Sequence, residues 1–343
     1  MPTEADLSPK GAARVAREAA TQSFDNAARA LNIDWGSGYD GKQIQRWGEA
    51  LGRTLVGRRD RELAAMAKGE LPPAAANGHQ LLVIGMDGGR VQTREKSGET
   101  GSRWKENKVL TITSCLRGDG ADRPPEKLLS TCLATMEDAG GFGPMVRLEA
   151  ERRGIRNAAE VIGIHDGGNW IDPLWERHFG CHVRILDYYH ASEHLHEAAR
   201  AAASVVAAGE QAEALAGQWV GLLWDGQVGP LLDQLRESAA RAGRPREGDP
   251  ADHPRAVLSK TAGYFERHRD QVDYPGYRAR GWPIGSGITE SGVKLFGKRV
   301  KGTEQFWNVA GAEAIMALRS KWLSEDEQSR YYWLGRGSEA MAA

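Results

Sequence analysis

Two aspartates in this sequence stand where apolar stretches end, and each is followed by a pair of glycines. Asp87 follows the apolar run 81–86, and Asp166 follows the shorter run 161–164 and one histidine. A carboxylate at the end of a buried strand is costly unless it is hydrogen-bonded, paired or bound to a cation. The two acids together therefore indicate a cation site, whereas either one alone would also fit an ordinary Asp-Gly turn.

A third acid, Glu290, begins a basic stretch. In a helix, Glu290, Lys294, Lys298 and Lys301 recur at spacings that place them along one face. Such a face would place the Glu290 carboxylate at a metal ion and the lysines on neighbouring DNA phosphates. The lysine contacts would give an affinity for DNA that depends on salt and is independent of base sequence. The alternative is a solvated helix with a glutamate–lysine pair four residues apart.

Three carboxylates that converge at one sheet edge suit hard cations. They can hold two Mg²⁺ ions, with Mn²⁺ as a substitute, because both metals accept oxygen ligands. In such a pair one ion activates the attacking hydroxyl and the other stabilises the leaving oxygen, while the paired glycines leave backbone room for a nucleotide. The predicted chemistry is phosphoryl transfer on a nucleic acid.

The elements that would position these acids alternate between strands and helices. Strands are expected at 81–86, 108–116, 161–164 and 182–186, with helices at 144–159, 169–179 and 189–208 between or after them. This alternation predicts an α/β core. The sequence after this region is rich in Ala and Leu and has no strand pattern, which indicates a helical insertion. After the insertion, one helix is expected to run to about residue 300, and a last helix is expected at 307–323.

The region before the core reads as helical from residue 10 to residue 70, with a break at 35–41. Two helices around a glycine-rich turn, the second one basic, are typical of a helix-turn-helix, although any helical hairpin gives the same pattern. Lys42 and Arg46 are its candidate DNA contacts. We expect four segments: an N-terminal helical region with a linker (1–78), the first part of the core (79–208), an α-helical insertion (209–278), and the completion of the core with a C-terminal helix (279–343).

Composition restricts the classes of partner. The 343 residues are 41% hydrophobic and 27% charged, with a formal net charge of −1, so any contact with DNA must be local. No stretch approaches the roughly 20 apolar residues of a membrane span, and the first ten residues do not resemble a secretory signal. We expect a cytoplasmic protein with no membrane partner.

Cysteine and histidine usage gives a weaker signal. The three cysteines, Cys115, Cys132 and Cys181, are widely spaced and are interpreted as reduced packing residues. Four histidines lie near Cys181, namely His182, His190, His194 and His196. They make a zinc site conceivable, but no CxxC completes a tetrahedral cluster.

Five short motifs occur together in this sequence: IGMDGG at 84–89, WKENKV at 104–109, IGIHDGG at 162–168, LDYYH at 186–190 and IGSGITES at 284–291. In this order and spacing, over about residues 80–323, they resemble the Kra-type bacterial insertion-sequence transposases, relatives of the Mutator-like group. The resemblance implies a ribonuclease-H-like core, a mixed sheet flanked by helices, with an α-helical insertion before the last acid. It also implies a catalytic, metal-binding triad of Asp87, Asp166 and Glu290.

The resemblance includes an acid-or-cysteine, two residues, then histidine pattern, which Asp187 and His190 match. His190 would contact the scissile phosphate or orient a metal ligand, or the pair would only cap a helix. Asp187 also ends an apolar strand, so it is the main rival of Asp166 as second ligand.

Further candidate DNA contacts follow from the same resemblance and from the basic helix. Trp104 and Lys108 match its Trp-x-Glu-x-Lys pattern, and Trp307 would stack on an unpaired base. A tryptophan packed in the core explains Trp104 and Trp307 as well. The full set of candidate DNA contacts is Lys294, Lys298, Arg299, Lys301, Trp307, Trp104, Lys108, Lys42 and Arg46.

The expected function is that of a DDE transposase that binds the ends of its element in double-stranded DNA, cleaves them and joins the 3′-OH to target DNA. Because two ends are coupled, a homodimer or larger assembly is expected, associated with the bacterial nucleoid when bound. The alternatives are a catalytically inactive DNA-binding regulator and a structure-specific nuclease on the same fold.

Overall fold

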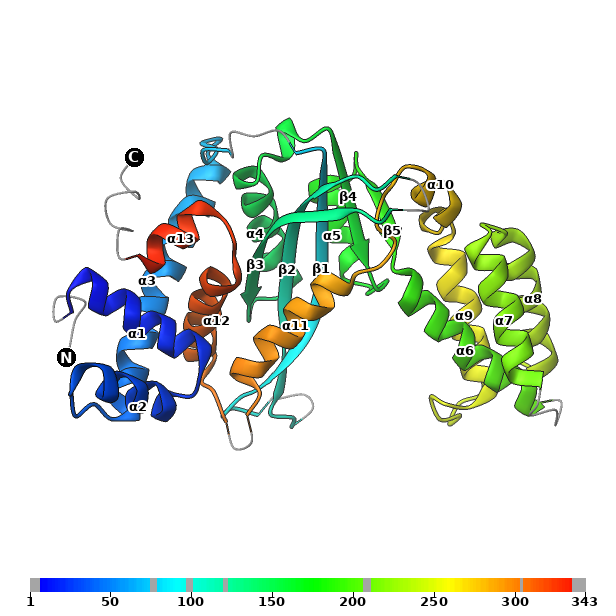
Figure 1. The fold of residues 1–343 in the computed structure, drawn as a ribbon. Helices are drawn as coiled ribbons and strands as arrows, with labels where there is room; N and C mark the ends of the chain where they lie inside the picture. Colours follow the sequence, from blue (N-terminus) through cyan, green and yellow to red (C-terminus); the bar gives the residue numbers. More distant parts are fainter. Residues whose placement is uncertain are drawn as a thin grey trace.

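The computed structural model describes residues 7–74, 79–96, 101–119, 123–205, 211–302 and 305–334. The chain is elongated: N-terminal helices and the last two helices form one end, a sheet lies in the middle, and a group of helices forms the other end (Figure 1). In the described residues no helix is both long and apolar enough to cross a membrane.

The central sheet is mixed, in the order β3-β2-β1-β4-β5. Its strands are β1 (Leu81–Gln92), β2 (Trp104–Leu116), β3 (Glu126–Thr135), β4 (Glu160–His165) and β5 (Val183–Leu186). β1, β2 and β3 form antiparallel pairs, whereas β4 pairs in parallel with both β1 and β5. The expected mixed sheet flanked by helices is confirmed, and its arrangement is compatible with a ribonuclease-H-like fold.

The strands differ from the expectation in two places. β1 does not end at Asp87 but continues to Gln92, because Gly88 and Gly89 pair with Lys108 and Asn107 of β2. β3 was not anticipated; its first three residues, 126–128, are all exposed although one of them is a leucine, which hides the alternation typical of a strand.

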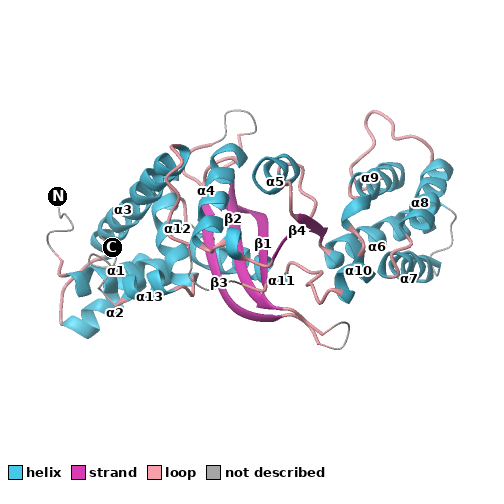
Figure 2. Ribbon diagram, turned by 90° about the horizontal axis from the view of Figure 1, so that it is seen from above, coloured by secondary structure: helices cyan, strands magenta, loops and turns pink. Residues whose placement is uncertain are grey.

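Two helices cover one face of the sheet. They are α4 (Ala139–Arg152) and α5 (Ile171–Phe179), and Figure 2 shows them on the side opposite α11 (Gly287–Val300). Alternation along β1 turns Leu82, Ile84 and Met86 toward α4 and α5, where they join one hydrophobic cluster. Residues Gly85 and Asp87 therefore belong to the other face, which α11 covers.

The expected helix at 144–159 starts earlier and is shorter. Asp138 caps α4, its side chain accepting a hydrogen bond from Gly141 N at 2.9 Å, and the helix ends at Arg152 before a short turn of 3₁₀ helix, η2 (Ile155–Asn157). This cap satisfies an otherwise unpaired amide of the first turn.

The helical insertion is confirmed and forms the far end of the molecule (Figure 1). Its elements are α7 (Gln211–Trp224), α8 (Val228–Ala242), α9 (Pro254–Arg267), η3 (Arg269–Gln271) and α10 (Tyr274–Ala279). They pack on α6 (Tyr188–Val205) around a core that includes Leu195, Trp219 and Leu231. This core is continuous with the β4 and β5 side chains Ile164 and Ile185, so the insertion is packed onto the sheet edge.

The N-terminal region contains three helices where two were expected: α1 (Pro9–Thr21), α2 (Phe24–Trp35) and α3 (Gly41–Ala67). The additional break arises because Ser23 caps α2, its side chain accepting a hydrogen bond from Asn26 N. α3 packs against α12 (Val309–Leu323), which is followed by α13 (Glu327–Trp333). At Gly52 the contact is so close that a Cβ would lie 2.2 Å from the Ala314 carbonyl oxygen.

Candidate active site

Asp87 lies inside β1 on the face that α11 covers. Two residues earlier, Gly85 lets α11 approach the sheet directly, since a Cβ there would lie 1.8 Å from Thr289 Oγ1. Thr289 Oγ1 is also 2.8 Å from Thr111 Oγ1 of β2. The helix that carries Glu290 is thus seated on the strand that carries Asp87.

Asp166 directly follows β4, which pairs in parallel with β1. Its Oδ1 accepts a hydrogen bond from Gly168 N at 2.9 Å, and the turn requires Gly167, whose φ of +86° suits glycine. The Asp166 carbonyl oxygen accepts a hydrogen bond from Tyr264 Oη at 2.9 Å. Tyr264 belongs to α9, so the insertion contacts the turn that presents Asp166.

Glu290 lies in the first turn of α11 with its side chain 47% exposed. Its carboxylate is 3.6 Å from Lys294 Nζ, and Ser286 Oγ lies 3.4 Å away. The inward face of α11 consists of Thr289, Gly292, Phe296, Arg299 and Val300. The remaining face, with Glu290, Lys294 and Lys298, is open to solvent.

Electrostatics tie the three acids together. Burial is the main cause that raises the pKa of Asp87, to about 6, and the charges of Asp166 and Glu290 raise it further. A hydrogen bond from Gly88 N and the nearby His190 act in the opposite direction. The Asp87 carboxyl group therefore experiences two negative charges, and the positive charge nearby does not balance them.

Asp187 is placed differently from the other acids. It is fully buried, its Oδ1 accepts a hydrogen bond from His190 N at 2.8 Å, and its Oδ2 accepts one from Ser286 N. His190 N lies in the first turn of α6, and Ser286 immediately precedes α11. The Asp187 carboxylate therefore joins the starts of two helices.

His190 is half-exposed on α6, where its ring is 3.7 Å from Glu193 and 4.8 Å between centroids from the His194 ring. Across the described ranges, no three His, Cys, Asp or Glu side chains are arranged closely enough to hold a metal ion as they stand. This applies to the three candidate acids and to the histidines around Cys181 alike.

Three of the predicted DNA contacts, Lys108, Arg299 and Trp307, have buried side chains. Lys108 is 4% exposed, pairs with Glu106 at 2.7 Å and lies over the Trp170 ring. Arg299 is 3% exposed and donates from Nε to Ala19 O at 2.7 Å. Trp307 is 6% exposed, precedes α12 and donates from Nε1 to Val300 O at 3.0 Å. All three stabilise packing.

The other candidate DNA contacts are exposed. They are Lys42 and Arg46 on α3, Trp104 at the start of β2, and Lys294, Lys298 and Lys301 on or just after α11. Trp104 is 45% exposed. Further along α3, by contrast, Arg53, Arg58 and Arg59 form ion pairs with Glu49, Glu62 and Glu313.

Among the cysteines, the packing interpretation is wrong for Cys181, which is exposed, whereas Cys115 is buried and Cys132 half-buried. Burial raises the pKa of Cys115 to about 11 and that of Cys132 to about 12. All three are free thiols.

Sequence reasoning missed Tyr264, which contacts the Asp166 turn from 98 residues away. It also missed Phe306, whose ring lies under Arg103 and whose carbonyl oxygen accepts a hydrogen bond from Arg94 Nε. Both contacts join segments distant in sequence, so no local pattern indicates them.

No protein-family model and no curated protein matches the chain. Among solved structures, the chain is similar to the Drosophila P element transposase strand transfer complex. The TM-score is 0.34 and the sequence identity 11%, over 88% of this chain and 96% of that one.

Proposed function

We propose that this chain is a metal-dependent DDE transposase that cleaves DNA at element ends and joins the resulting 3′-OH to target DNA. The observation that supports this most directly is that Asp87, whose pKa is raised to about 6 chiefly by burial, also experiences the charges of Asp166 and Glu290 at one face of the sheet. A protein that only bound DNA would gain nothing from placing three acids together beside phosphates.

The donor chemistry of the site fits Mg²⁺ or Mn²⁺. All three side chains offer carboxylate oxygens, and a cation would relieve the repulsion that raises the pKa of Asp87. When bound, two such ions supply activation of the attacking oxygen and stabilisation of the leaving oxygen. Glu290 is on an exposed helix turn, so its side chain is free to move toward Asp87 and Asp166 when a cation binds.

Asp166 is the better second ligand than Asp187. One oxygen of Asp166 accepts the hydrogen bond from Gly168 N, and its side chain is only half-buried. Asp187 is fully buried and both of its oxygens accept backbone hydrogen bonds. We assign Asp187 to holding α6 and α11, and His190 to the site because its charge acts on Asp87.

The exposed lysines beside Glu290 would hold the DNA. Lys294, Lys298 and Lys301 continue from the acid along α11, and contacts to phosphates from them would orient the backbone without reading bases. Trp104 offers an exposed aromatic surface for a base. Because transposition couples two ends, we propose that two or more copies of the chain act together on DNA.

The chemistry of the two steps is a displacement at phosphorus. In cleavage, a water oxygen bonds to the phosphorus and the P–O3′ bond breaks, leaving a 3′-OH. In joining, that 3′-OH attacks a target phosphate and displaces another 3′ oxygen. A nuclease on the same fold would perform the cleavage step alone, so the joining step distinguishes the two enzymes.

The test uses a supercoiled plasmid carrying the DNA that flanks the gene. We expect Mg²⁺-dependent cutting that chelator and Glu290→Gln both abolish. The matched control is Glu237→Gln, an exposed glutamate on α8 in the insertion, which should cut normally. Binding without cutting in every metal would identify a regulator. Cutting without joining of pre-cut ends would identify a nuclease.

A further inference from the structure

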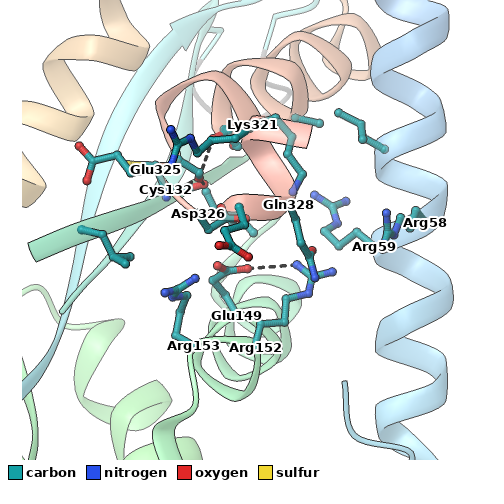
Figure 3. Close-up of a pocket in the computed structure, with 18 of the residues that line it drawn as sticks. Arg58, Arg59, Cys132, Glu149, Arg152, Arg153, Lys321, Glu325, Asp326 and Gln328 are labelled. Atoms are coloured by element: carbon teal, nitrogen blue, oxygen red, sulfur yellow. Dashed lines mark hydrogen bonds and ion pairs between the residues drawn. The ribbon is translucent and has the colours of Figure 1, made fainter. Parts of the chain in front are cut away.

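A second region of the molecule is built for a ligand. A cavity of about 710 Å³ lies between α3, α4, α12 and the start of α13, and none of the three candidate acids lines it. Figure 3 shows Arg58 and Arg59 on α3 at one side, Glu149 and Arg152 on α4 below, with Arg153 directly after that helix, and Lys321 above. Its volume is within the range of small-molecule pockets.

Three of the acids that line this cavity already have partners. Asp326 caps α13, accepting from Ser329 N at 3.0 Å and from Ser329 Oγ at 2.7 Å. Glu325 accepts from Lys127 Nζ at 2.8 Å and from Ser130 N at 2.6 Å. Glu149 pairs with Arg152 at 3.0 Å.

Two cations in the wall, Arg153 and Lys321, have fewer direct contacts. Arg153 is only 8% exposed, and its Nε has no hydrogen-bond partner. Lys321 Nζ contacts Ser329 Oγ at 3.4 Å. Within the described part of the chain neither side chain forms an ion pair within 4.0 Å. The charges of Glu149 and Asp326 act on both cations, but the buried Arg153 Nε donor stays without an acceptor. Such a donor is costly, and an oxyanion in the cavity would offset that cost.

The same wall contains further positive charge, part of which is paired, since Arg152 forms ion pairs with Glu62 and Glu149. Burial lowers the pKa of Arg152 to about 10, and the charges of Arg58 and Arg59 lower it further. His79, 9% exposed, also faces the cavity with no partner for Nε2, and burial together with Arg153 lowers its pKa. A neutral imidazole beside a guanidinium can hydrogen-bond an oxyanion.

We propose that this cavity binds a small molecule bearing a phosphate group, held by Arg153 and Lys321, with His79 as a further hydrogen-bonding group. A guanidinium matches the geometry of phosphate oxygens. We infer a small molecule rather than DNA because Arg153 is buried in the inner wall, whereas duplex phosphates are contacted by exposed cations.

The probe is pyrophosphate, titrated calorimetrically into the full chain in chelator, so that binding through a metal at Asp87 cannot contribute. We expect saturable binding that Arg153→Gln weakens by about tenfold or more, because a charge-assisted hydrogen bond is lost. The matched control, Arg156→Gln, lies just past α4 but outside the cavity and pairs with Glu151 at 2.8 Å. It should bind normally.

Three outcomes would overturn the proposal. They are no saturable binding by the wild type, unchanged binding by Arg153→Gln, and displacement of pyrophosphate by a short DNA duplex, which would make the cavity part of a DNA surface. If Arg153→Gln does not fold, Ala317→Met decides, since Ala317 lines the cavity and the larger side chain would fill it. Binding retained in that variant rejects the site. Because the assay needs no cleavage, it is independent of the transposase proposal.

Discussion

The Asp187 carboxylate accepts a hydrogen bond from Ser286 N, across 99 positions of sequence, while its other oxygen accepts one from His190 N. One buried side chain thereby fixes the start of α11, which carries Glu290, relative to α6, which carries His190. The relative position of two candidate site residues depends on a residue that would itself contact neither DNA nor metal.

Asp187→Asn should lower the free energy of unfolding by about 1–3 kcal/mol, because the amide nitrogen cannot accept a backbone hydrogen bond and leaves a buried N–H unpaired. Urea unfolding measures this change. Plasmid cutting should fall while DNA binding is retained. A variant that is destabilised but cuts at the wild-type rate would contradict the positioning role.

Asp87→Asn should stabilise the metal-free protein at neutral and alkaline pH. The folded state holds the Asp87 proton up to about pH 6, whereas an unfolded aspartate releases it near 3.8. Between these values the folded state binds more protons, so stability falls as pH rises through this window. In chelator, the variant should gain about 3 kcal/mol at about pH 8 and almost nothing below about pH 3.

Added Mg²⁺ provides the complementary measurement on Asp87→Asn. It should raise the melting temperature of the wild type, because a ligand of the folded state stabilises it, and should raise that of the variant much less. Equal metal stabilisation of both proteins would show that Asp87 is not a ligand.

Gly85→Ala should be destabilising by about 1–3 kcal/mol and should impair cutting, since the methyl group would collide with Thr289 and displace α11. Gly217→Ala is the matched control: nothing lies within 4 Å of a Cβ there, and α7 should gain up to about 1 kcal/mol from the helix preference of alanine. Thermal unfolding compares them. If both variants behave alike, the close approach at Gly85 does not matter.

Tyr264→Phe removes only the hydroxyl that donates to the Asp166 carbonyl oxygen. The expected loss is about 0.5–1.5 kcal/mol of stability together with slower cutting at unchanged DNA affinity. Tyr39→Phe, in the loop before α3, serves as the control. Wild-type cutting by Tyr264→Phe would mean that the insertion does not position the Asp166 turn.

Lys298→Ala and Arg299→Ala should separate binding from folding, although the residues are adjacent. Lys298 is exposed, so its replacement should weaken DNA binding and leave stability unchanged. It should also reduce by about 1 the slope of the logarithm of DNA affinity against the logarithm of salt concentration. Arg299 is buried and donates a hydrogen bond to Ala19 O, so its replacement should instead lower the free energy of unfolding. If Lys298→Ala lowered stability and left the salt dependence of DNA binding unchanged, Lys298 would have a structural role and would not contact DNA.

Apolar runs predicted strands β1, β4 and β5, and helical periodicity predicted α6, α11 and the insertion, because these signals are local. β3 is hard to predict because its exposed start, 126–128, carries no alternation of polar and apolar residues, and the continuation of β1 depends on pairing with β2 rather than on its own residues. Composition cannot report burial in three dimensions, so the sequence does not show that Lys108, Arg299 and Trp307 are buried. The three candidate acids can be named from the sequence because each follows or begins a clear element; the Asp187 link to Ser286 is purely tertiary.

The same link has a topological consequence. The chain leaves the sheet after β5 at Asp187 and comes back to this residue at Ser286, just before α11. The segment between them, called the excursion here, therefore forms a loop whose two ends are joined by one hydrogen bond. The cost of closing such a loop grows only slowly with its length. The excursion can therefore change in length at modest cost, provided that Tyr264 of α9 keeps its contact with the Asp166 turn.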